Sequence, residues 1–401
     1  MAVAVDMKVE QIREQCPAVR DTVYLNTGTC GPLPTPVHAA MRETMDAELA
    51  HGRIAPEHYP HLIAAGKAVK AVSADILHCD PDELAITDAT RDGMNLAIAG
   101  YPWQRGDEII TSNIEHPGGL VPTFLTKKRY GTRVRIADIG LGDGNTESIV
   151  QEFERLITPR TKMIVISHIS YTTGTVLPVA EIVAMAHSHD VLVAVDAAQS
   201  FGQVPLDMHA LDVDFYACPG QKWMCGPEGT GVFYARMSSV GEIGQVFAAG
   251  SGAVSGTLDY YGADYQVAPG ATRFDRGGDN LALLVGQRAA TEWFRDDVGP
   301  EWAYARIAQL GQYAAGRLRT MNGITIVTPE ERMAGLVAFV VDGITPTDLK
   351  LRLRAEHNVT IRDVVKYINN PPALRISTGF YNTEEDIDRL ITAIAAVQAS
   401  R

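Results

Sequence analysis

Cysteine is scarce in this sequence. The 401 residues contain five cysteines, none occurs after Cys225, and no two have the spacing of a CxxC motif. An odd and sparse set of cysteines is typical of reduced thiols in the cytoplasm, and a chain of this length buries roughly 75% of its unfolded surface without disulfides. We therefore expect a cytoplasmic protein whose fold depends on no disulfide.

Long apolar runs and an excess of basic residues are missing as well. No apolar run approaches the ~20 residues that span a bilayer, and Asp6, Lys8 and Glu10 interrupt any apolar signal core at the start. Acidic residues outnumber basic ones by 48 to 35, which gives a net charge of −13. Because this charge repels polyphosphates and anionic lipid surfaces, we expect neither a nucleic-acid nor a membrane partner.

The signatures of several enzyme classes are absent too. The chain has no GxxxxGK[ST] phosphate loop, no HExxH zinc motif and no GxSxG nucleophile elbow. The cluster His-Ser-His-Asp at 187–190 lies at the expected end of a helix, where such groups suit the helix dipole. We therefore interpret this cluster as structural and assign no metal site.

The chain does contain a regular alternation of short apolar segments and helical patterns between about residues 84 and 236. The expected strands are Leu84–Thr87, Glu108–Thr111, Val134–Ala137, Met163–Ile166, Val191–Val195, Asp214–Ala217 and Gly231–Ala235. Short strands that are apolar on both faces and separated by helices predict an α/β fold with a mainly parallel, doubly covered sheet. Helical patterns precede this unit, and the pattern after about residue 280 indicates a smaller α+β domain.

The most informative stretch runs from residue 191 to residue 234. Asp196 ends an apolar strand, which places its carboxylate at the carboxyl edge of a parallel sheet, where α/β proteins bind ligands. Gln199 follows, and Lys222 lies in an apolar segment rich in Gly and Pro. Such a lysine is a candidate for a desolvated Schiff-base lysine. From these residues alone, a turn-forming Asp and an ion-paired Lys remain the commoner alternatives.

Several motifs together resemble the class V aminotransferase family of pyridoxal-phosphate enzymes. That family includes cysteine desulfurases, cystine C-S lyases and isopenicillin-N-epimerase-like enzymes. The resemblance covers most of the chain and rests on these segments: Tyr24–Asn26 with Gly31-Pro32, Ala89-Thr90, Glu115–Pro117, Ser167–Ser170, Asp196–Gln199, Lys222-Trp223 with GPEGTG, Thr272–Gly278 and Leu374–Ser377. It implies fold-type I, with a seven-stranded type of sheet in a large domain at 20–275 and a small domain formed by 1–19 plus 276–401.

The resemblance also implies how pyridoxal 5'-phosphate is held. The backbone of Ala89 and Thr90 and the Thr90 hydroxyl would bind its phosphate at a helix N-terminus, although an ordinary helix N-cap at Thr90 is the alternative. His116 would stack on the pyridine ring. Asp196 would keep the ring nitrogen protonated, and Gln199 would contact the phenolic oxygen.

The remaining roles concern the substrate and the subunit partner. Lys222 would form the Schiff base and act as the base at Cα. Arg375 would bind the carboxylate of a small amino-acid substrate, with Tyr171 and Asn26 as further candidate substrate contacts. Gly277-Gly278 would reach the phosphate site of a neighbouring subunit, so the resemblance implies a homodimer.

Three residues depart from the family pattern. Gln221 stands directly before the lysine where desulfurases have His, and an amide cannot shuttle a proton. Pro219 replaces a Ser or Thr that touches the phosphate. Tyr171 replaces an Asn beside the cofactor. Phosphate binding would therefore depend more on Thr90 and on Gly277-Gly278 of the partner subunit.

The distribution of cysteine decides between members of the family. A desulfurase needs a mobile cysteine shortly before the carboxylate-binding arginine, and residues 359–374 contain none. We therefore expect a C-S β-lyase, which cleaves a cysteine-derived thioether or disulfide to aminoacrylate, pyruvate and ammonia with release of a thiol or persulfide. An aminotransferase, an epimerase or a decarboxylative deaminase of the same family is the alternative, because these enzymes use the same residues.

Overall fold

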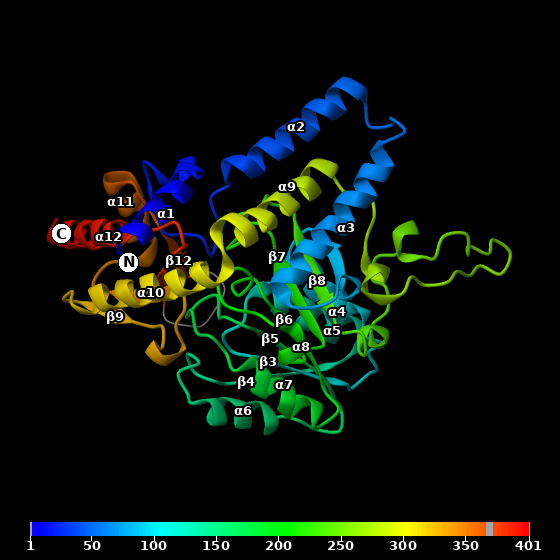
Figure 1. The fold of residues 1–401 in the computed structure, drawn as a ribbon. Helices are drawn as coiled ribbons and strands as arrows, with labels where there is room; N and C mark the ends of the chain where they lie inside the picture. Colours follow the sequence, from blue (N-terminus) through cyan, green and yellow to red (C-terminus); the bar gives the residue numbers. More distant parts are fainter. Residues whose placement is uncertain (1, 366–371, 401) are drawn as a thin grey trace.

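A seven-stranded sheet forms the centre of the structure (Figure 1). The computed structural model of the chain describes residues 2–365 and 372–400, apart from the side chains of residues 2–6. The strands of this sheet are β2 (Leu84–Thr87), β3 (Glu108–Ser112), β4 (Arg133–Ala137), β5 (Thr161–Ser167), β6 (Leu192–Asp196), β7 (Phe215–Pro219) and β8 (Gly231–Ala235). Their order is β2-β8-β7-β6-β5-β3-β4, and β8 alone among them runs antiparallel to its neighbours. The predicted mainly parallel α/β sheet is confirmed.

Both faces of this sheet are buried, as its uninterrupted apolar strands predict. In β5, Ile164 and Ile166 belong to a core with α3 (His58–Leu77), α6 (Thr146–Glu154) and α7 (Val179–His187). Met163 and Val165 belong to a core with α4 (Thr90–Gly100). Alternate residues of a strand point to opposite faces, so these two cores lie on opposite sides of the sheet. Two further helices follow strands of this sheet or precede them, α5 (Pro117–Tyr130) and α8 (Met208–Leu211).

A second sheet of four antiparallel strands, in the order β12-β13-β10-β9, is built from the C-terminal third of the chain. Its elements are β9 (Ile324–Ile326), β10 (Leu336–Val341), β12 (Arg362–Val364) and β13 (Ala373–Ser377), with α10 (Pro300–Arg319), α11 (Pro346–His357) and α12 (Glu384–Ala399). The N-terminal segment joins this part, because β1 (Val23–Tyr24) pairs with β11 (Val359–Thr360) and Arg13 of α1 (Ala2–Glu14) bonds Asp386 at 3.0 Å. The domain boundaries expected from the sequence stay a prediction.

A helical arm, formed by α2 (Thr35–His51) and the N-terminal part of α3, projects from the body of the molecule, whereas the C-terminal part of α3 is buried (Figure 1). It packs against α9 (Leu281–Glu292), which continues into a π-helical turn at Trp293–Val298. The structure separates this helical stretch from α10 at Gly299. Gly299 takes a φ of 77°, a left-handed conformation that suits glycine, and Pro300 then starts the next helix. In the part of the chain described here, no helix is both long and apolar enough to cross a membrane.

Removal of a buried ring from the central sheet is expected to destabilise the fold strongly. Phe233 of β8 is fully buried and stacks on Phe215 with ring centroids 6.0 Å apart. Phe233→Ala should lower the free energy of unfolding by about 3–5 kcal/mol, because it removes packed surface and leaves a cavity. Phe124→Ala is the matched control, since that ring is 43% exposed. Equal losses for the two variants in denaturant titrations would contradict this view of the core.

Candidate active site

The carboxyl edge of the central sheet presents a buried carboxylate. Asp196 ends β6, beside Ser167 at the end of β5. Its Oδ1 accepts a hydrogen bond from the N–H of Ala198 at 2.9 Å. Gly118, in the first turn of α5, lies near Oδ2, since a β-carbon there would sit 3.8 Å from that oxygen. The Asp196 carboxylate therefore lies beneath the start of α5, at the edge where the sequence places it.

Lys222 lies in the turn between β7 and β8, at the same edge of the sheet. Burial lowers the pKa of its amine to about 8; the charge of Asp196 opposes this shift and that of Arg375 adds to it. Among the described residues, the amine has no hydrogen bond or ion pair. Gly31 closes over this turn: its N–H donates to the carbonyl of Gln221 at 2.8 Å. The lysine is therefore held by its backbone, and its neutral, nucleophilic form is accessible near physiological pH.

His116 begins α5 and faces Tyr171. Its Nδ1 accepts a hydrogen bond from the N–H of Gly118 at 3.0 Å, so the neutral ring carries its proton on Nε2. The imidazole meets the ring of Tyr171 edge-on, with centroids 4.8 Å apart. Burial lowers the pKa of His116, although the charge of Asp196 acts in the opposite direction. The imidazole is therefore neutral and fixed in orientation.

The N-terminus of α4 offers an anion site. Ala89, not Thr90, is the N-cap residue, and it makes no side-chain cap. The alternative that Thr90 is an ordinary N-cap is therefore wrong. The Thr90 hydroxyl is buried and lacks a hydrogen-bond partner in the described residues. A buried hydroxyl at the positive end of an 11-residue helix fits a phosphate group.

Arg375 is a fully buried cation. It lies in the middle of β13 with 0% of its side chain exposed, and burial lowers its pKa to about 10. Its Nη1 donates to the carbonyl of Tyr171 at 2.9 Å, and its guanidinium lies over the Tyr171 ring at 5.2 Å from the centroid. Nε and Nη2 have no partner within the described part of the chain. These two nitrogens are thus left for a bound anion.

A second guanidinium lies beside the first, and sequence reasoning did not find it. Arg362 in β12 is the direct cross-strand partner of Arg375 in β13. Its Nε is buried and has no hydrogen bond to any described residue. Its charge acts on both Lys222 and His116, which places it at the same site. The signal was the antiparallel pairing of two short strands, which the sequence pattern did not reveal.

Most of the hydrogen-bonding capacity of the Gln199 amide is taken up by other residues of the protein. Its Nε2 donates to the carbonyl of Gly28 at 2.9 Å, and its Oε1 accepts from the indole of Trp223 at 3.0 Å. One N–H of the amide remains for a ligand. Asn26 forms a backbone bridge with Ser377, and its Oδ1 accepts from Thr29 at 2.8 Å. Both residues therefore line the seam between the two sheets.

Gly277 and Gly278 lie farther from this cluster, next to the turn before α4. Both adopt positive φ angles, 69° and 68°, which favour glycine. Arg276 forms an ion pair with Asp88 of its own chain. Gly278 is exposed and has open space around it. This segment is therefore accessible to another molecule.

The residues that flank Lys222 do not add a reactive thiol. Cys218 and Cys225 are fully buried, and burial raises the pKa of each thiol well above its usual value. Both thiols therefore stay protonated at neutral pH, as packing residues do. Pro219 ends β7, and the Oε1 of Gln221 is buried without a partner among the described residues.

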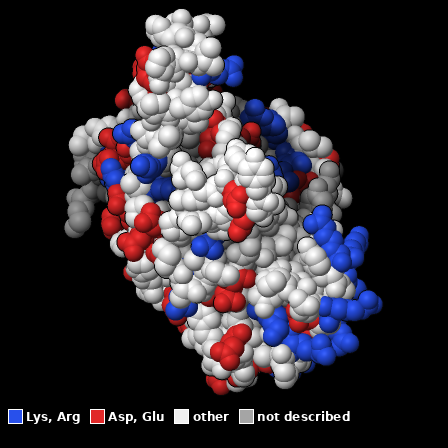
Figure 2. Space-filling model, turned by 90° about the vertical axis from the view of Figure 1, so that its right-hand side faces the viewer, with Lys and Arg blue, Asp and Glu red and all other residues white. Residues whose placement is uncertain are grey.

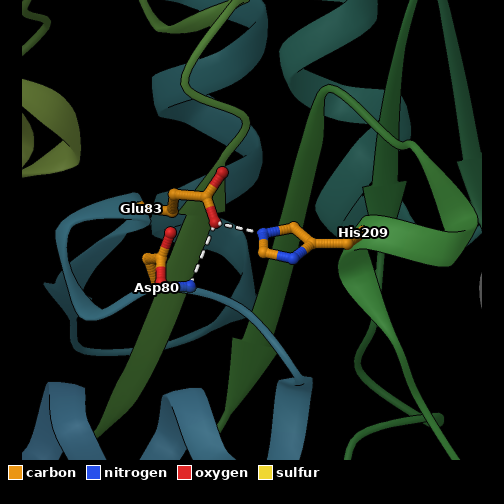
Figure 3. Close-up of side chains that lie close together, drawn as sticks. All are labelled: Asp80, Glu83 and His209. Carbon is orange, nitrogen blue, oxygen red and sulfur yellow. Dashed lines mark hydrogen bonds and ion pairs between the residues drawn. The ribbon is translucent and has the colours of Figure 1, made fainter.

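One histidine–carboxylate cluster lies outside the site (Figure 3). Ligand atoms of Asp80, Glu83 and His209 lie within 4.8 Å of one another. Glu83 already accepts hydrogen bonds from His209 at 2.8 Å, from the N–H of Asp80 at 3.1 Å, and from Tyr234 and Met237. These bonds account for the buried carboxylate, so the cluster ties the segment before β2 to α8.

The buried His168 near Asp196 makes stability depend on pH. Its Nδ1 lies 2.7 Å from the hydroxyl of Tyr216, and burial lowers its pKa to about 4. An unfolded histidine has a pKa of about 6.5. The unfolded chain then binds more protons between these values, so the free energy of unfolding falls as the pH drops through this window.

We expect His168→Asn, which keeps a polar group for Tyr216, to reduce the loss of stability between pH 7 and pH 4.5 by about 2 kcal/mol. Denaturant titrations of both proteins at the two pH values measure this difference. The same loss in both proteins would show that His168 does not titrate as described.

Comparisons with known proteins match the whole of this architecture. The family model for class-V aminotransferases matches residues 23–390. A probable cysteine desulfurase from Methanothermobacter thermautotrophicus is 29% identical over 96% of this chain and 96% of that protein. A cysteine desulfurase from Haloferax volcanii is 32% identical over 79% of this chain and 75% of that protein.

A solved structure with the same fold is the cystine C-S lyase C-DES in complex with its reaction product cysteine persulfide. It superimposes with a TM-score of 0.88 and 27% identity over 95% of this chain and 99% of that one. A C-DES variant with glycine covalently linked to its pyridoxal-phosphate cofactor gives a TM-score of 0.89 and 26% identity, over 96% of this chain and 98% of that one. The predicted fold class is confirmed, and the chain belongs to the class-V aminotransferase family.

Proposed function

We propose that this protein is a pyridoxal-phosphate-dependent C-S lyase that cleaves cystine or a similar dicarboxylic derivative of cysteine. The observation that carries the proposal is the cross-strand pair of Arg375, which is fully buried, and Arg362, whose Nε is buried without a hydrogen bond to any described residue. The likeness to a cystine C-S lyase over almost the whole chain supports it.

The site residues fit the cofactor group by group. The Thr90 hydroxyl and the N-terminus of α4 would hold the phosphate. Asp196 would stabilise a protonated ring nitrogen, His116 would cover the ring face, and the free N–H of Gln199 would reach the phenolic oxygen. Lys222 would hold the carbonyl carbon covalently. Pyridoxal phosphate supplies the electron sink that stabilises negative charge at the substrate Cα.

Lys222 is the group proposed to move the proton. With the substrate bound, the free amine of Lys222, which has a pKa of about 8, would take the proton from the substrate Cα. The neutral ring of His116 keeps its proton on Nε2 and so retains one hydrogen-bond donor. Arg375 fixes the substrate carboxylate through the two nitrogens that have no partner in the described chain.

A second carboxylate is what the second arginine would recognise. The positive charges of Arg362 and Arg375 repel each other, and three of their nitrogens (Nε of each residue and Nη2 of Arg375) are buried without a hydrogen-bond partner among the described residues. One carboxylate takes up the fork of Arg375 and leaves Arg362 unsatisfied. A substrate with a carboxylate at each end satisfies both.

The sulfur would leave without passing to an enzyme cysteine. When the Cα proton is removed, the Cβ–S bond breaks and its electron pair goes to sulfur. Cystine then gives cysteine persulfide and aminoacrylate, which hydrolyses to pyruvate and ammonia. Residues 359–374 contain no cysteine that could take up the sulfur.

We infer that the working unit is a homodimer. The α2–α3 arm exposes apolar side chains, with Leu49 87% and Ile54 92% exposed, and Tyr261 in the loop after η4 (Gly250–Gly252) is fully exposed. In Figure 2 the part of the surface that projects at the top carries few charged side chains. A second copy of the chain is proposed to cover these surfaces, with the Gly277-Gly278 segment, of which Gly278 is exposed, at the neighbouring phosphate site.

Replacement of Lys222 tests the proposed chemistry. Lys222→Ala should abolish the borohydride-dependent attachment of pyridoxal phosphate and lower kcat for pyruvate release from cystine by about 10²–10⁴-fold. The exposed Lys128→Ala serves as the control. Covalent attachment that persists in Lys222→Ala would refute the assignment. A keto acid that forms only with an added oxo acid would indicate an aminotransferase, and exchange at Cα without pyruvate would indicate an epimerase.

Replacement of Arg362 tests the proposed substrate. Arg362→Gln should raise KM for cystine at least about tenfold, because loss of a buried ionic contact costs more than 1.4 kcal/mol. KM for S-methylcysteine, which has one carboxylate, should change less than about threefold. Equal changes for both substrates in steady-state assays would contradict a second carboxylate site.

A further inference from the structure

A buried glutamate lies directly before His116. The side chain of Glu115 is 2% exposed, and its Oε1 accepts a hydrogen bond from the hydroxyl of Ser112 at 2.6 Å. Its Oε2 accepts one from the hydroxyl of Ser167 at 2.5 Å. Both serines are buried, and none of the described cations forms an ion pair with Glu115. Each carboxylate oxygen therefore accepts a hydrogen bond from the last residue of a different strand.

The two serines belong to neighbouring strands. Ser112 ends β3 and Ser167 ends β5, and these strands run parallel and pair with each other. Ser167 also lies beside Asp196 in the register of β5 and β6. Glu115 thus joins three adjacent features of the carboxyl edge: the end of β3, the end of β5 and His116, the N-cap residue of α5.

His116 has little else to define its position. Its Nδ1 bonds the N–H of Gly118, which lies in the same helix and moves with it, and its ring meets Tyr171 edge-on. Consecutive Cα atoms are joined at about 3.8 Å, so a displacement of Glu115 passes directly to His116. The hydrogen bonds of Glu115 tie this point of the chain to the ends of β3 and β5.

An ionised carboxyl group lowers the stability of the fold at this buried position, so we expect Glu115 to have a function that compensates for this loss. Burial raises its pKa to about 7, the two serine hydroxyls oppose this shift, and the negative charge of Asp196 adds to it. A carboxylate without a cation, beside a second carboxylate, costs free energy in a buried setting. Such costs are typically found where geometry at a functional site requires them.

We propose that Glu115 is a positioning residue that fixes the His116 ring over the cofactor by bridging Ser112 and Ser167. This inference rests on the proposed function. The amide of Glu115→Gln retains one acceptor and one donor for the serines, whereas Glu115→Ala removes both contacts. Glu83, a second buried and hydrogen-bonded glutamate at the opposite edge of the sheet, provides the matched control.

The test is a double-mutant cycle with the holoenzyme. Glu115→Ala should lower kcat for pyruvate release from cystine at least about tenfold with KM changed less than threefold. Glu115→Gln should retain at least about half of kcat, and Glu83→Ala should leave kcat unchanged even if it lowers Tm equally. If Glu115 acts through His116, the variant with Glu115→Ala and His116→Gln should be no slower than His116→Gln alone.

Additive losses in the cycle, or an equal loss of kcat in Glu83→Ala, would overturn the inference. Visible circular dichroism of bound pyridoxal phosphate, recorded on the same variants, tests the role of Glu115 independently of the proposed lyase activity. If the wild-type protein releases no pyruvate, the lyase proposal fails. The inference still stands if Glu115→Ala alters the dichroic band as His116→Gln does, and it fails if the band is unchanged.

Discussion

The buried guanidinium of Arg375 is the interaction on which the rest of the site depends. A fully desolvated cation is unfavourable unless hydrogen bonds and charge compensate it. Here one nitrogen bonds the Tyr171 carbonyl and the Tyr171 ring lies beneath the group, while two nitrogens have no partner in the described chain. Its charge also helps to lower the pKa of Lys222. The same guanidinium thus favours a bound anion and the neutral form of the lysine amine.

The contact between Arg375 and Tyr171 also joins the two sheets. Arg375 belongs to β13 of the four-stranded sheet, whereas Tyr171 follows β5 of the seven-stranded sheet. Close packing at Gly174, where a β-carbon would meet the backbone of Leu336, holds the same seam. The central sheet thus provides Asp196, Lys222 and His116, and the smaller sheet provides the two arginines. In the function proposed above, the substrate anion and the cofactor ring would therefore be recognised by different parts of the chain.

The sequence was informative where local pattern decides structure. Apolar runs such as 191–195 predict the strand that ends at Asp196, and the position of Lys222 after a strand predicts its place at the same edge. Arg362 could not be found in this way, because β12 has three residues, two of them charged, and only its register with β13 places it beside Arg375.

Recognition of a second substrate carboxylate by Arg362 beside Arg375 can be measured without turnover. The ligand is 2,7-diaminosuberate, the carbon analogue of cystine, which has no Cβ–S bond to cleave, and the method is calorimetric titration of the holoenzyme. This dicarboxylate should bind at least about tenfold more tightly than norleucine, a difference of about 1.4 kcal/mol. Equal affinities for the two amino acids would contradict it.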